Sequence, residues 1–444
     1  MAKVVVVGGG VAGISAALAA ARLGAATTLV ESSNVVGLSK ALLPSILSED
    51  KREGDLVLPD VGALAANGIE LKTGHSVTRI SNAEKKVVVG LPGKTAQDSK
   101  AEGTLKFDSL VLCTGARPEA PDLRGLSKPN VFLLRGPSDY VRLASRLGEF
   151  ETVAVSGPIP LALRLGEILA NRGKRAKIFC GAKGLERQFS EPIANGIREH
   201  AASMYEPSQV SLLEESVDSI MGVERAEAVG AAGFVHTCDA VVMVPRSVPS
   251  FPTIDCDKGR NGGILVDNSM STSLPGIFAA GDSAEIRFKS GSVPARLFST
   301  SKVCGDVAGT NAAGGNSSAT PSWSVEQTYF GLDYCSAGLS EEEASSIGLE
   351  ASTAVSESGE GELDGRRLVT LVSMVFDNAT HQVYGIQAAG RRASSLSSAA
   401  SLIVALGLSV EQLVNLESSY HPGPGNETSP IALTARKVGD TKGA

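Results

Sequence analysis

The sequence predicts an α/β protein with two Rossmann-like dinucleotide-binding domains, the second inserted in the first, and an α+β domain at the C-terminus. Residues 3–31 have the pattern of a strand, a glycine turn, a helix and a second strand. Residues 153–162 repeat the strand and the turn before another helical pattern, although two of the glycines are missing. A Ser/Gly/Pro linker in residues 312–322 precedes a segment with a strand hairpin and an amphipathic helix.

The composition argues against several other classes of protein. The chain has 444 residues, and 43% of them are hydrophobic, so it can bury large cores. Its net charge of −7 argues against a nucleic-acid partner held through phosphate contacts. The longest apolar stretches are strand-sized or carry glycine and serine, so we expect no integral membrane segment.

Cysteine usage indicates a reducing compartment. The six cysteines are scattered and form no C-x-x-C pair, and the histidines show no ligand spacing. The N-terminus enters a strand directly, without a signal-peptide cleavage region. We therefore expect a cytoplasmic protein without a bound metal. The cysteines are Cys113, Cys180, Cys238, Cys256, Cys304 and Cys335.

The first turn carries the fingerprint G-x-G-x-x-G, filled by Gly8, Gly10 and Gly13. Gly8 permits the tight turn, Gly10 lets the backbone approach a pyrophosphate, and Gly13 lets the helix pack on the strand. The helix N-terminus then faces the phosphates with free N–H groups. Glu31 ends the second strand, where a carboxylate would hold a ribose diol. Together these features predict a dinucleotide site.

Two later motifs follow the glycine fingerprint along the chain. One apolar strand ends in Thr114-Gly115, and a later short strand ends in Gly281-Asp282. The order G-x-G-x-x-G, x-T-G-x-x-P and A-x-G-D resembles the pyridine nucleotide–disulfide oxidoreductases, flavoproteins with two dinucleotide domains. In that family the first fingerprint binds the ADP half of FAD, and the aspartate binds the ribityl chain or the pyrophosphate.

The resemblance implies a particular FAD site. A helix within residues 291–314 would point its N-terminus at the flavin pyrimidine, and Ser299 and Thr300 are N-cap residue types at its start. The expected FAD-binding residues are Gly8, Gly10, Val11, Ala12, Gly13, Glu31, Ser39, Lys40, Val77, Thr114, Gly115, Arg117, Gly281, Asp282, Ser299 and Thr300.

The C-terminal segment resembles one branch of the family. Residues 338–350, 375–390 and 408–437 look like the dimerisation domain of the coenzyme A-disulfide reductases and NADH oxidases, so a homodimer is expected. In these relatives a Pro/Gly loop reaches the flavin of the other subunit, and here that loop holds Tyr420 and His421. The predicted domains are an FAD-binding domain in residues 1–120 and 249–316, an NAD(P)-type domain in residues 121–248, and a dimerisation domain in residues 317–444.

The redox cysteine of this branch is missing. Relatives carry it in a pattern like S-x-x-x-C-G-L-P, whereas residues 37–47 are GLSKALLPSIL. Ala41 takes the cysteine position if the segments are aligned from Pro44, and Leu43 takes it if they are aligned from Ser39. A thiolate beside the flavin is the chemistry of disulfide reduction. Without it, the usual disulfide route is closed.

The second fingerprint is also altered. Pro158 and Pro160 remove backbone N–H donors, and Ile159 places a branched side chain where the backbone would approach a pyrophosphate. The next strand ends in Cys180 instead of a ribose-binding carboxylate. Two interpretations stay open: nicotinamide binding is lost or greatly changed, or NAD(P)H binds in a shifted pose.

Lys183 and Arg187 follow the altered strand and would tolerate a 2′-phosphate, so NADPH is slightly favoured over NADH. Pro245 also stands where the corresponding strand of this domain usually ends in glycine.

Four residues are candidates for chemistry beside the flavin. Lys40 would place a cation near the ring or an anionic substrate, unless it is an ordinary exposed lysine. Tyr420 matches a tyrosine that relatives bring across the dimer interface, and His421 is either an acid–base group or a loop histidine. Cys304 is either a displaced thiol or a small buried hydrophobe.

Three functions are compatible with these features. The leading hypothesis is an FAD-dependent oxidoreductase with a cysteine-independent active site, which passes electrons between flavin and a small molecule, a quinone-like acceptor or dioxygen. The second is an NAD(P)H-dependent enzyme like a coenzyme A-disulfide reductase or an NADH oxidase. The third is a flavin-binding protein without turnover, acting as a sensor or as an electron-transfer subunit with a redox partner protein.

Overall fold

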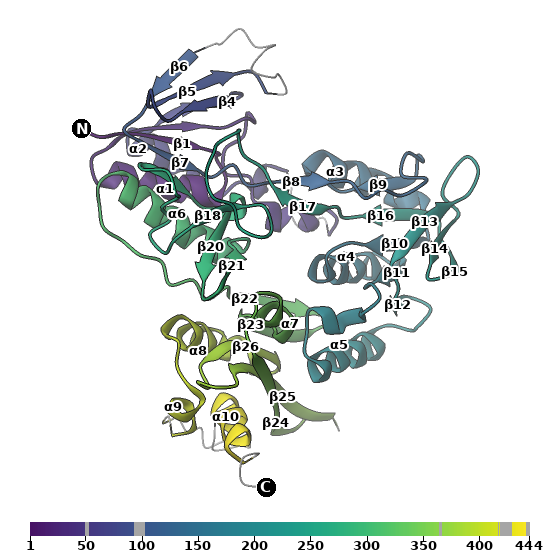
Figure 1. Cartoon of the computed structure of the whole chain (residues 1–444). Coiled ribbons are helices and arrows are strands. Elements are labelled where there is room, and N and C mark those ends of the chain that lie inside the picture. Colours follow the sequence, from purple (N-terminus) through teal and green to yellow (C-terminus); the bar gives the residue numbers. More distant parts are fainter. Residues whose placement is uncertain (49–52, 93–102, 364–365, 416, 418–428, 441–444) are drawn as a thin grey trace. The chain divides into compact units, whose positions relative to one another are not determined.

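The computed structural model describes residues 1–48, 53–92, 103–363, 366–415, 417 and 429–440. The chain divides into two compact units, which Figure 1 shows coloured along the sequence. The first unit comprises Met1–Leu43, Lys51–Glu119 and Ser247–Pro321, and the second comprises Pro44–Asp50, Ala120–Arg246 and Ser322–Ala444. The sequence predicts four domain segments. They stay a prediction, because a division into two units does not separate the NAD(P)-type domain from the dimerisation domain.

The first unit is built on a five-stranded parallel sheet in the order β19-β7-β1-β2-β3. Its strands are β1 (Lys3–Val7), β2 (Ala26–Val30), β3 (Glu70–Lys72), β7 (Ser109–Leu112) and β19 (Ile277–Ala279). The four valines of β1 are all buried, as expected for a parallel strand covered on both faces. The fingerprint turn follows β1 directly, so it lies at the carboxyl end of the central strand.

Two helices of this unit pack side by side with very small residues between them (Figure 1). They are α1 (Val11–Arg22) and α6 (Phe298–Ala312). A Cβ added at Gly305 would overlap the carbonyl oxygen of Ala12, and one at Gly309 would overlap that of Ala16. Because of this close contact, the late segment that carries α6 folds onto the fingerprint helix.

Shorter elements surround this core. They are α2 (Val61–Ala66), the antiparallel sheet β4 (Ser76–Ser81), β5 (Lys86–Gly90) and β6 (Gly103–Lys106), the sheet β18 (Ile264–Val266), β20 (Ala284–Phe288) and β21 (Gly291–Pro294), and the pair β8 (Ala116–Glu119) and β17 (Arg246–Pro249). A 3-10 helix, Lys40–Ile46, contains the segment where the redox cysteine was expected.

The second unit contains another five-stranded parallel sheet, in the order β12-β11-β10-β16-β9. Its strands are β9 (Val131–Leu133), β10 (Thr152–Ser156), β11 (Arg175–Phe179), β12 (Val210–Leu213) and β16 (Ala240–Met243), and its helices are α3 (Pro137–Arg146), α4 (Ile159–Asn171) and α5 (Glu191–Met204). A separate antiparallel sheet comprises β13 (Val217–Met221), β14 (Ala228–Ala231) and β15 (Phe234–Thr237).

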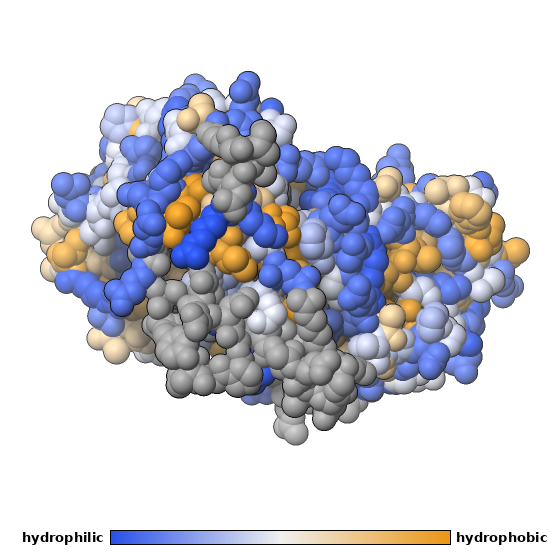
Figure 2. Space-filling model, turned by 90° about the horizontal axis from the view of Figure 1, so that it is seen from below, coloured by the Kyte–Doolittle hydropathy of each residue, from blue (hydrophilic) through white to orange (hydrophobic). Residues whose placement is uncertain are grey.

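Exposed apolar side chains gather over the β13–β15 sheet (Figure 2). The exposed fractions are 89% for Val223, 65% for Phe234 and 62% for Val235. Patches of this kind mark candidate interaction surfaces. None of these three residues belongs to the altered fingerprint of the same unit.

The C-terminal part of the second unit is an antiparallel sheet in the order β22-β23-β26-β25-β24 with helices α7 to α10. The strands are β22 (Val325–Tyr329), β23 (Leu332–Gly338), β24 (Ala351–Leu363), β25 (Arg366–Asp377) and β26 (Val383–Gly390), and the helices are α7 (Glu341–Ser346), α8 (Ala393–Leu406), α9 (Val410–Val414) and α10 (Pro430–Asp440). The expected α/β fold, with two parallel Rossmann-like sheets and a C-terminal antiparallel domain, is therefore confirmed. Among the described helices, none combines the length and the apolar character that a membrane crossing requires.

Candidate functional site

Each glycine of the first fingerprint has its own structural reason. Gly8 has a φ of +105°, and a Cβ there would overlap the carbonyl oxygen of Cys113. A Cβ at Gly13 would overlap the carbonyl oxygen of Gly8, so only glycine lets α1 pack this close to β1. Gly10 has no heavy atom within 4 Å of an added Cβ, so its backbone borders open space.

Glu31 holds the fingerprint loop in place through both carboxylate oxygens. Oε2 accepts a hydrogen bond from the backbone N–H of Gly9 at 2.6 Å. Oε1 accepts bonds from the backbone N–H of Ser33 at 2.7 Å and the hydroxyl of Ser32 at 3.1 Å. Glu31 therefore shapes the loop, and it also borders the cavity described next.

A cavity of about 680 Å³ opens over the carboxyl ends of β1, β2 and β7. Its size falls in the range of ordinary cofactor sites. The Thr114 hydroxyl, which lines it, is buried and has no hydrogen-bond partner among the described residues. The lining residues are Val7, Gly8, Gly9, Gly10, Val30, Glu31, Ser32, Ser33, Val35, Leu38, Lys40, His75, Ser76, Val77, Cys113, Thr114, Gly115, Ala116, Arg117, Pro118, Ser250, Phe251 and Pro252.

A second cavity, of about 170 Å³, adjoins the first. The two share Gly10, Leu38, Lys40, Cys113 and Gly115 as lining residues. The smaller one is also lined by Val11, Ala12, Ser39, Ala41, Leu58, Gly281, Asp282, Arg296, Phe298 and Ser301. All three chain segments of the first unit therefore contribute residues to the wall of this smaller cavity.

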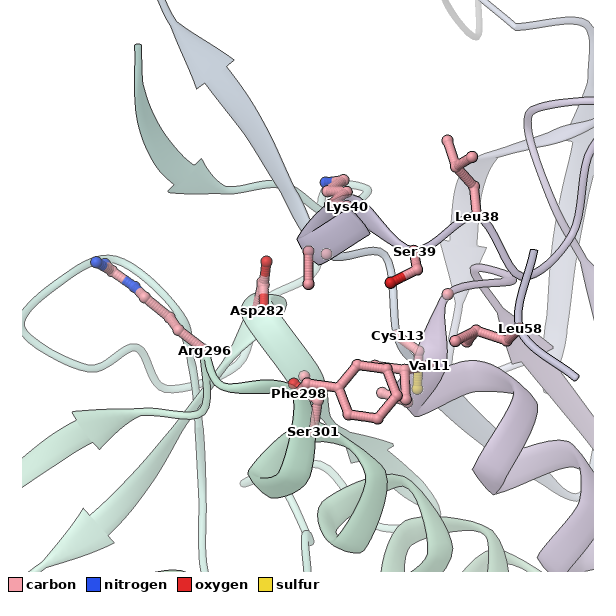
Figure 3. A pocket seen from close by; sticks show the side chains of 15 residues that line it. Val11, Leu38, Ser39, Lys40, Leu58, Cys113, Asp282, Arg296, Phe298 and Ser301 are labelled. Carbon is pink, nitrogen blue, oxygen red and sulfur yellow. The ribbon is translucent and has the colours of Figure 1, made fainter. Parts of the chain in front are cut away.

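Lys40 and Asp282 lie on separate segments that border this smaller cavity (Figure 3). Burial raises the pKa of Asp282, while the nearby charges of Lys40 and Arg296 act in the opposite direction. The Lys40 ammonium also donates a hydrogen bond to the carbonyl oxygen of Ala116 at 3.2 Å. The wall thus carries two cations and one carboxylate.

The structure gathers most of the predicted FAD-binding residues at the two cavities, but not all of them. Gly13, Ser299 and Thr300 line neither cavity in the described part of the chain. The expected N-cap is wrong, because α6 begins at Phe298 and its N-cap is Leu297. Thr300 is instead buried inside the first turn of the helix. Residue type alone favoured Ser299 and Thr300 as the N-cap, whereas the backbone is still extended at Leu297 and becomes helical at Phe298.

Many residues that line the cavities are absent from the predicted site, among them Arg296, Phe298 and Phe251. Arg296 and Phe298 lie within residues 291–314, where the helix that faces the flavin was expected, whereas Phe251 lies in none of the motifs.

The residues of the two cavities fit an FAD. A ligand with hydroxyl groups would satisfy the orphaned Thr114 hydroxyl, and the open space at Gly10 admits a pyrophosphate. The first N–H groups of α1, from Val11 and Ala12, have no intrahelical partner and carry the positive end of the helix dipole. They line the smaller cavity, where they can donate to phosphate oxygens.

The cysteines near this site have the properties of buried structural residues. Cys113 lines both cavities but is only 6% exposed, and burial raises its pKa to about 12. Cys304 is completely buried on α6, and burial raises its pKa to about 12 as well. Neither side chain is a thiolate near neutral pH, so the structure favours the buried-hydrophobe interpretation of Cys304.

The altered fingerprint in the second unit has few donors for a phosphate. Pro158 and Pro160 have no N–H, and the N–H groups of Leu161 and Ala162 donate to the carbonyl oxygen of Pro158 at 3.0 and 2.9 Å. The backbone N–H of Ile159 takes part in neither of these hydrogen bonds, but the residue is only 7% exposed. The start of α4 therefore presents at most one such donor, fewer than the start of α1.

The remaining glycine of this loop has a packing role. A Cβ at Gly157 would lie 2.6 Å from the Cβ of Val244, which follows β16. Nearby, the Lys183 ammonium lies 3.0 Å from a carboxylate oxygen of Glu342 on α7. Both side chains of this ion pair are exposed, and exposed pairs are weak, so the preference for NADPH stays a prediction.

Comparison with protein families identifies the chain. The model of the pyridine nucleotide-disulphide oxidoreductases matches residues 2–298, and the model of the dimerisation domain of these oxidoreductases matches residues 325–428. The chain belongs to this family. It is an FAD-dependent pyridine nucleotide oxidoreductase.

Several members of the family resemble this chain over nearly its whole length. The NAD(P)H sulfur oxidoreductase (CoA-dependent) of Pyrococcus furiosus is 25% identical and covers 98% of both chains. The NADH oxidase of Methanocaldococcus jannaschii is 27% identical, over 83% of this chain and 82% of the relative. The structure of the water-forming NADH oxidase of Lactobacillus brevis has the same fold, with a TM-score of 0.86 at 20% identity over 99% of both chains.

These relatives favour the second of the three functions expected from the sequence. The resemblance to the branch that contains NADH oxidases and coenzyme A-dependent reductases is supported. Tyr420 and His421, which this branch would bring across a dimer interface, lie outside the described residues.

Proposed function

We propose that this chain is an FAD-dependent oxidoreductase that oxidises NAD(P)H and passes the electrons to a small acceptor without a cysteine beside the flavin. The names of the relatives support NAD(P)H as the electron donor. The observation that carries the cysteine-independent part is the cavity wall at the expected cysteine position, which is formed by Ser39, Lys40 and Ala41.

The residues of the first unit would hold FAD, which supplies two-electron redox chemistry when it is bound. Gly10 and the start of α1 would receive the pyrophosphate, and Glu31 would fix the loop and border the ribose. The Lys40 ammonium, held by the Ala116 carbonyl, keeps a positive charge at the boundary between the two cavities. Such a charge stabilises an anionic group there.

A small acceptor is favoured over a disulfide or persulfide. Reduction of a sulfur–sulfur bond in this way needs a thiolate that attacks one of the sulfurs. Cys113, the one cysteine that lines the cavities in the described part of the chain, is protonated near neutral pH. Dioxygen or a quinone-like molecule needs no such attack.

Anaerobic mixing of the purified protein with NADH or NADPH tests the proposal. We expect a yellow protein that releases FAD on denaturation and whose visible flavin absorption bleaches in a single kinetic phase. Admission of air or of a quinone should restore the absorption. Protein that retains FAD but is not bleached by either nucleotide would refute the NAD(P)H part of the proposal. Complete loss of turnover on changing Cys113→Ser, with FAD retained, would refute the cysteine-independent part.

A further inference from the structure

We propose that Arg172 is a positioning residue, which holds the short helix that begins at Lys40 and so keeps the lysine charge at the FAD site. This inference rests on the proposed function, because that function places FAD in the two cavities that Lys40 lines. Figure 3 shows Lys40 next to Ser39 at the wall of the smaller cavity. A reduced flavin carries negative charge near neutral pH, so a cation held nearby favours the reduced form.

The helix that begins at Lys40 has little stability of its own. Runs of 3-10 helix longer than three or four residues are uncommon, because their hydrogen bonds are poorly aligned. This helix, Lys40–Ile46, has seven residues, and Pro44 inside it has no N–H with which to continue the hydrogen bonding. Contacts with the rest of the protein must therefore fix its position.

The start of this helix is anchored within the first unit. The Ser39 N–H donates to the Leu56 carbonyl oxygen at 2.8 Å, and the Lys40 ammonium donates to the Ala116 carbonyl oxygen at 3.2 Å. The second bond lies at the long end of the usual range, and it comes from a flexible side chain. These contacts leave the far end of the helix to be held by other residues.

Arg172 anchors the far end. Its Nη1 donates to the carbonyl oxygen of Leu47, directly after the helix, at 2.9 Å, and the Leu47 side chain is fully buried. Both residues belong to the second unit. Arg172 is itself fixed, because it is the C-cap of α4 and its backbone N–H donates to the carbonyl oxygens of Ile168 and Leu169 at 3.0 and 3.1 Å. The guanidinium thus reaches the Lys40 segment from the end of a regular helix.

A neighbouring arginine serves as a matched control. Arg175 follows Arg172 by three residues, and its guanidinium lies 2.7 Å from a carboxylate oxygen of Glu151 and donates to the Thr152 hydroxyl. Loss of either arginine removes one positive charge from the same part of the chain. The bond to Leu47 distinguishes Arg172 from Arg175.

The midpoint potential of the bound FAD tests the inference, measured by redox equilibration with a reference dye. Lys40→Met should favour oxidised over reduced FAD by about tenfold, which is a fall of about 30 mV for a two-electron couple. Arg172→Met should lower the potential in the same direction, because the lysine is no longer held in place. Arg172→Lys, which keeps a charged donor, should restore most of the potential, and Arg175→Met should leave it unchanged.

A double-mutant cycle separates positioning from a direct effect of the arginine charge. If Arg172 acts through Lys40, Arg172→Met should not change the potential further in the Lys40→Met protein. A shift of the same size in both backgrounds would overturn the inference. An unchanged potential in Arg172→Met or in Lys40→Met alone would overturn it as well.

Thermal denaturation and the FAD absorption show whether each variant is folded and loaded. If Arg172→Met does not fold, Arg172→Gln takes its place in the cycle with the same expectations, because it keeps a neutral donor on a shorter side chain. The measurement uses neither NAD(P)H nor an electron acceptor from the proposed reaction. A failure of NAD(P)H oxidation therefore leaves this test valid, and an unchanged potential would overturn this inference while leaving the proposed function intact.

Discussion

Glu31 links the shape of the fingerprint loop to the binding of FAD. Its carboxylate accepts backbone hydrogen bonds from Gly9 and Ser33, and it also lines the larger cavity. A mutation at this position therefore removes a loop anchor and a ligand contact together.

We expect Glu31→Ala to weaken FAD binding by roughly 1–3 kcal/mol, because charge-assisted hydrogen bonds of this kind are worth about that much. Titration of the FAD-free protein with FAD measures the change. Glu70→Ala, on the neighbouring strand β3 and outside both cavities, is the control. Equal affinities for Glu31→Ala and the unmodified protein would show that the carboxylate contributes nothing to the cofactor site.

The cysteines allow a second test at the scale of single residues. Burial raises the pKa of all six. The pKa is about 12 for Cys113, Cys180, Cys304 and Cys335 and about 11 for Cys238. Cys256 is the least buried of the six. Thiols react as thiolates, so these side chains should be nearly inert in the folded protein.

A variant with all six cysteines replaced by serine or alanine should keep its rate of flavin reduction by NAD(P)H within a few fold, provided that it folds. Stopped-flow absorption measures this rate. In the unmodified protein, iodoacetamide should modify Cys256 first, as mass spectrometry of peptides would show. A large loss of rate on replacing Cys304 alone would instead mean that the reactive thiol has moved to α6.

At the scale of elements, the two fingerprint helices differ in their first turns. The start of α1 offers the N–H groups of Val11 and Ala12 to a ligand. The start of α4 has two prolines without an N–H, and its next N–H groups donate to the carbonyl oxygen of Pro158. Each lost charge-assisted hydrogen bond to a phosphate costs about 1.5–3 kcal/mol. Two such losses would weaken binding by roughly two to four powers of ten.

We therefore expect NADH and NADPH to bind with dissociation constants near the millimolar range. Replacing Pro158, Ile159 and Pro160 together with glycine should tighten binding, because it restores two N–H groups and removes the branched side chain. Isothermal titration measures both proteins. A low-micromolar dissociation constant for the unmodified protein would mean that the phosphates are held elsewhere.

The turn between β25 and β26 supplies a pH-dependent contribution to stability. Asp377 accepts hydrogen bonds from the Tyr384 hydroxyl at 2.7 Å, the backbone N–H groups of Ala379 and Thr380, and the Thr380 hydroxyl. The Tyr384 hydrogen bond and the turn donors lower the pKa of Asp377 to about 2. A carboxyl whose pKa is depressed in the folded state stabilises the fold above its unfolded pKa of about 4, and this contribution disappears as the pH falls towards 2.

Asp377→Asn should therefore lower the free energy of unfolding at pH 7 by on the order of 1 kcal/mol, since the turn is largely open to solvent. The difference from the unmodified protein should vanish near pH 2. Thermal denaturation across this pH range measures both effects, with Asn378→Ala in the same turn as the control. A difference that persists unchanged at low pH would assign the loss to packing instead of charge.

At the scale of the whole molecule, the match to a dimerisation domain supports the expected homodimer. The outer face of α8 carries Leu402, which is 60% exposed, and Leu406, which is 68% exposed. They lie one helical turn apart, next to the small residues Ser398 and Ala399. We expect this apolar face to contact the second copy in the dimer.

Leu402→Asp combined with Leu406→Asp should shift the protein from dimer to monomer, because two carboxylates would be buried without partners. Light scattering after size-exclusion chromatography measures the mass. Val223→Asp changes an exposed apolar residue over the β13–β15 sheet and should leave the mass unchanged (Figure 2). A double variant that stays dimeric would place the interface on another surface.

Much of the fold and part of the candidate site follow from short-range signals. The glycines after β1, the acid at the end of β2 and the motifs that end in Gly115 and Asp282 each lie within a few residues of a strand end. The carboxyl ends of parallel strands lie along one edge of the sheet, so residues at these ends lie close together in the folded protein. The helix α10 was not recognised, although a serine followed by a proline, here Ser429 and Pro430, is a typical helix start.

The two Rossmann-like sheets, the glycine loop and the absence of a cysteine where relatives carry one could be predicted before folding was considered, since each depends on residues close together in the chain. In contrast, the start of α6 after Leu297 and the position of Arg296 and Phe298 at the same cavity as Lys40 are visible only in the folded chain. These residues are more than 250 positions from Lys40. Their meeting depends on the tight packing of α6 on α1 through Gly305 and Gly309, which no local pattern specifies.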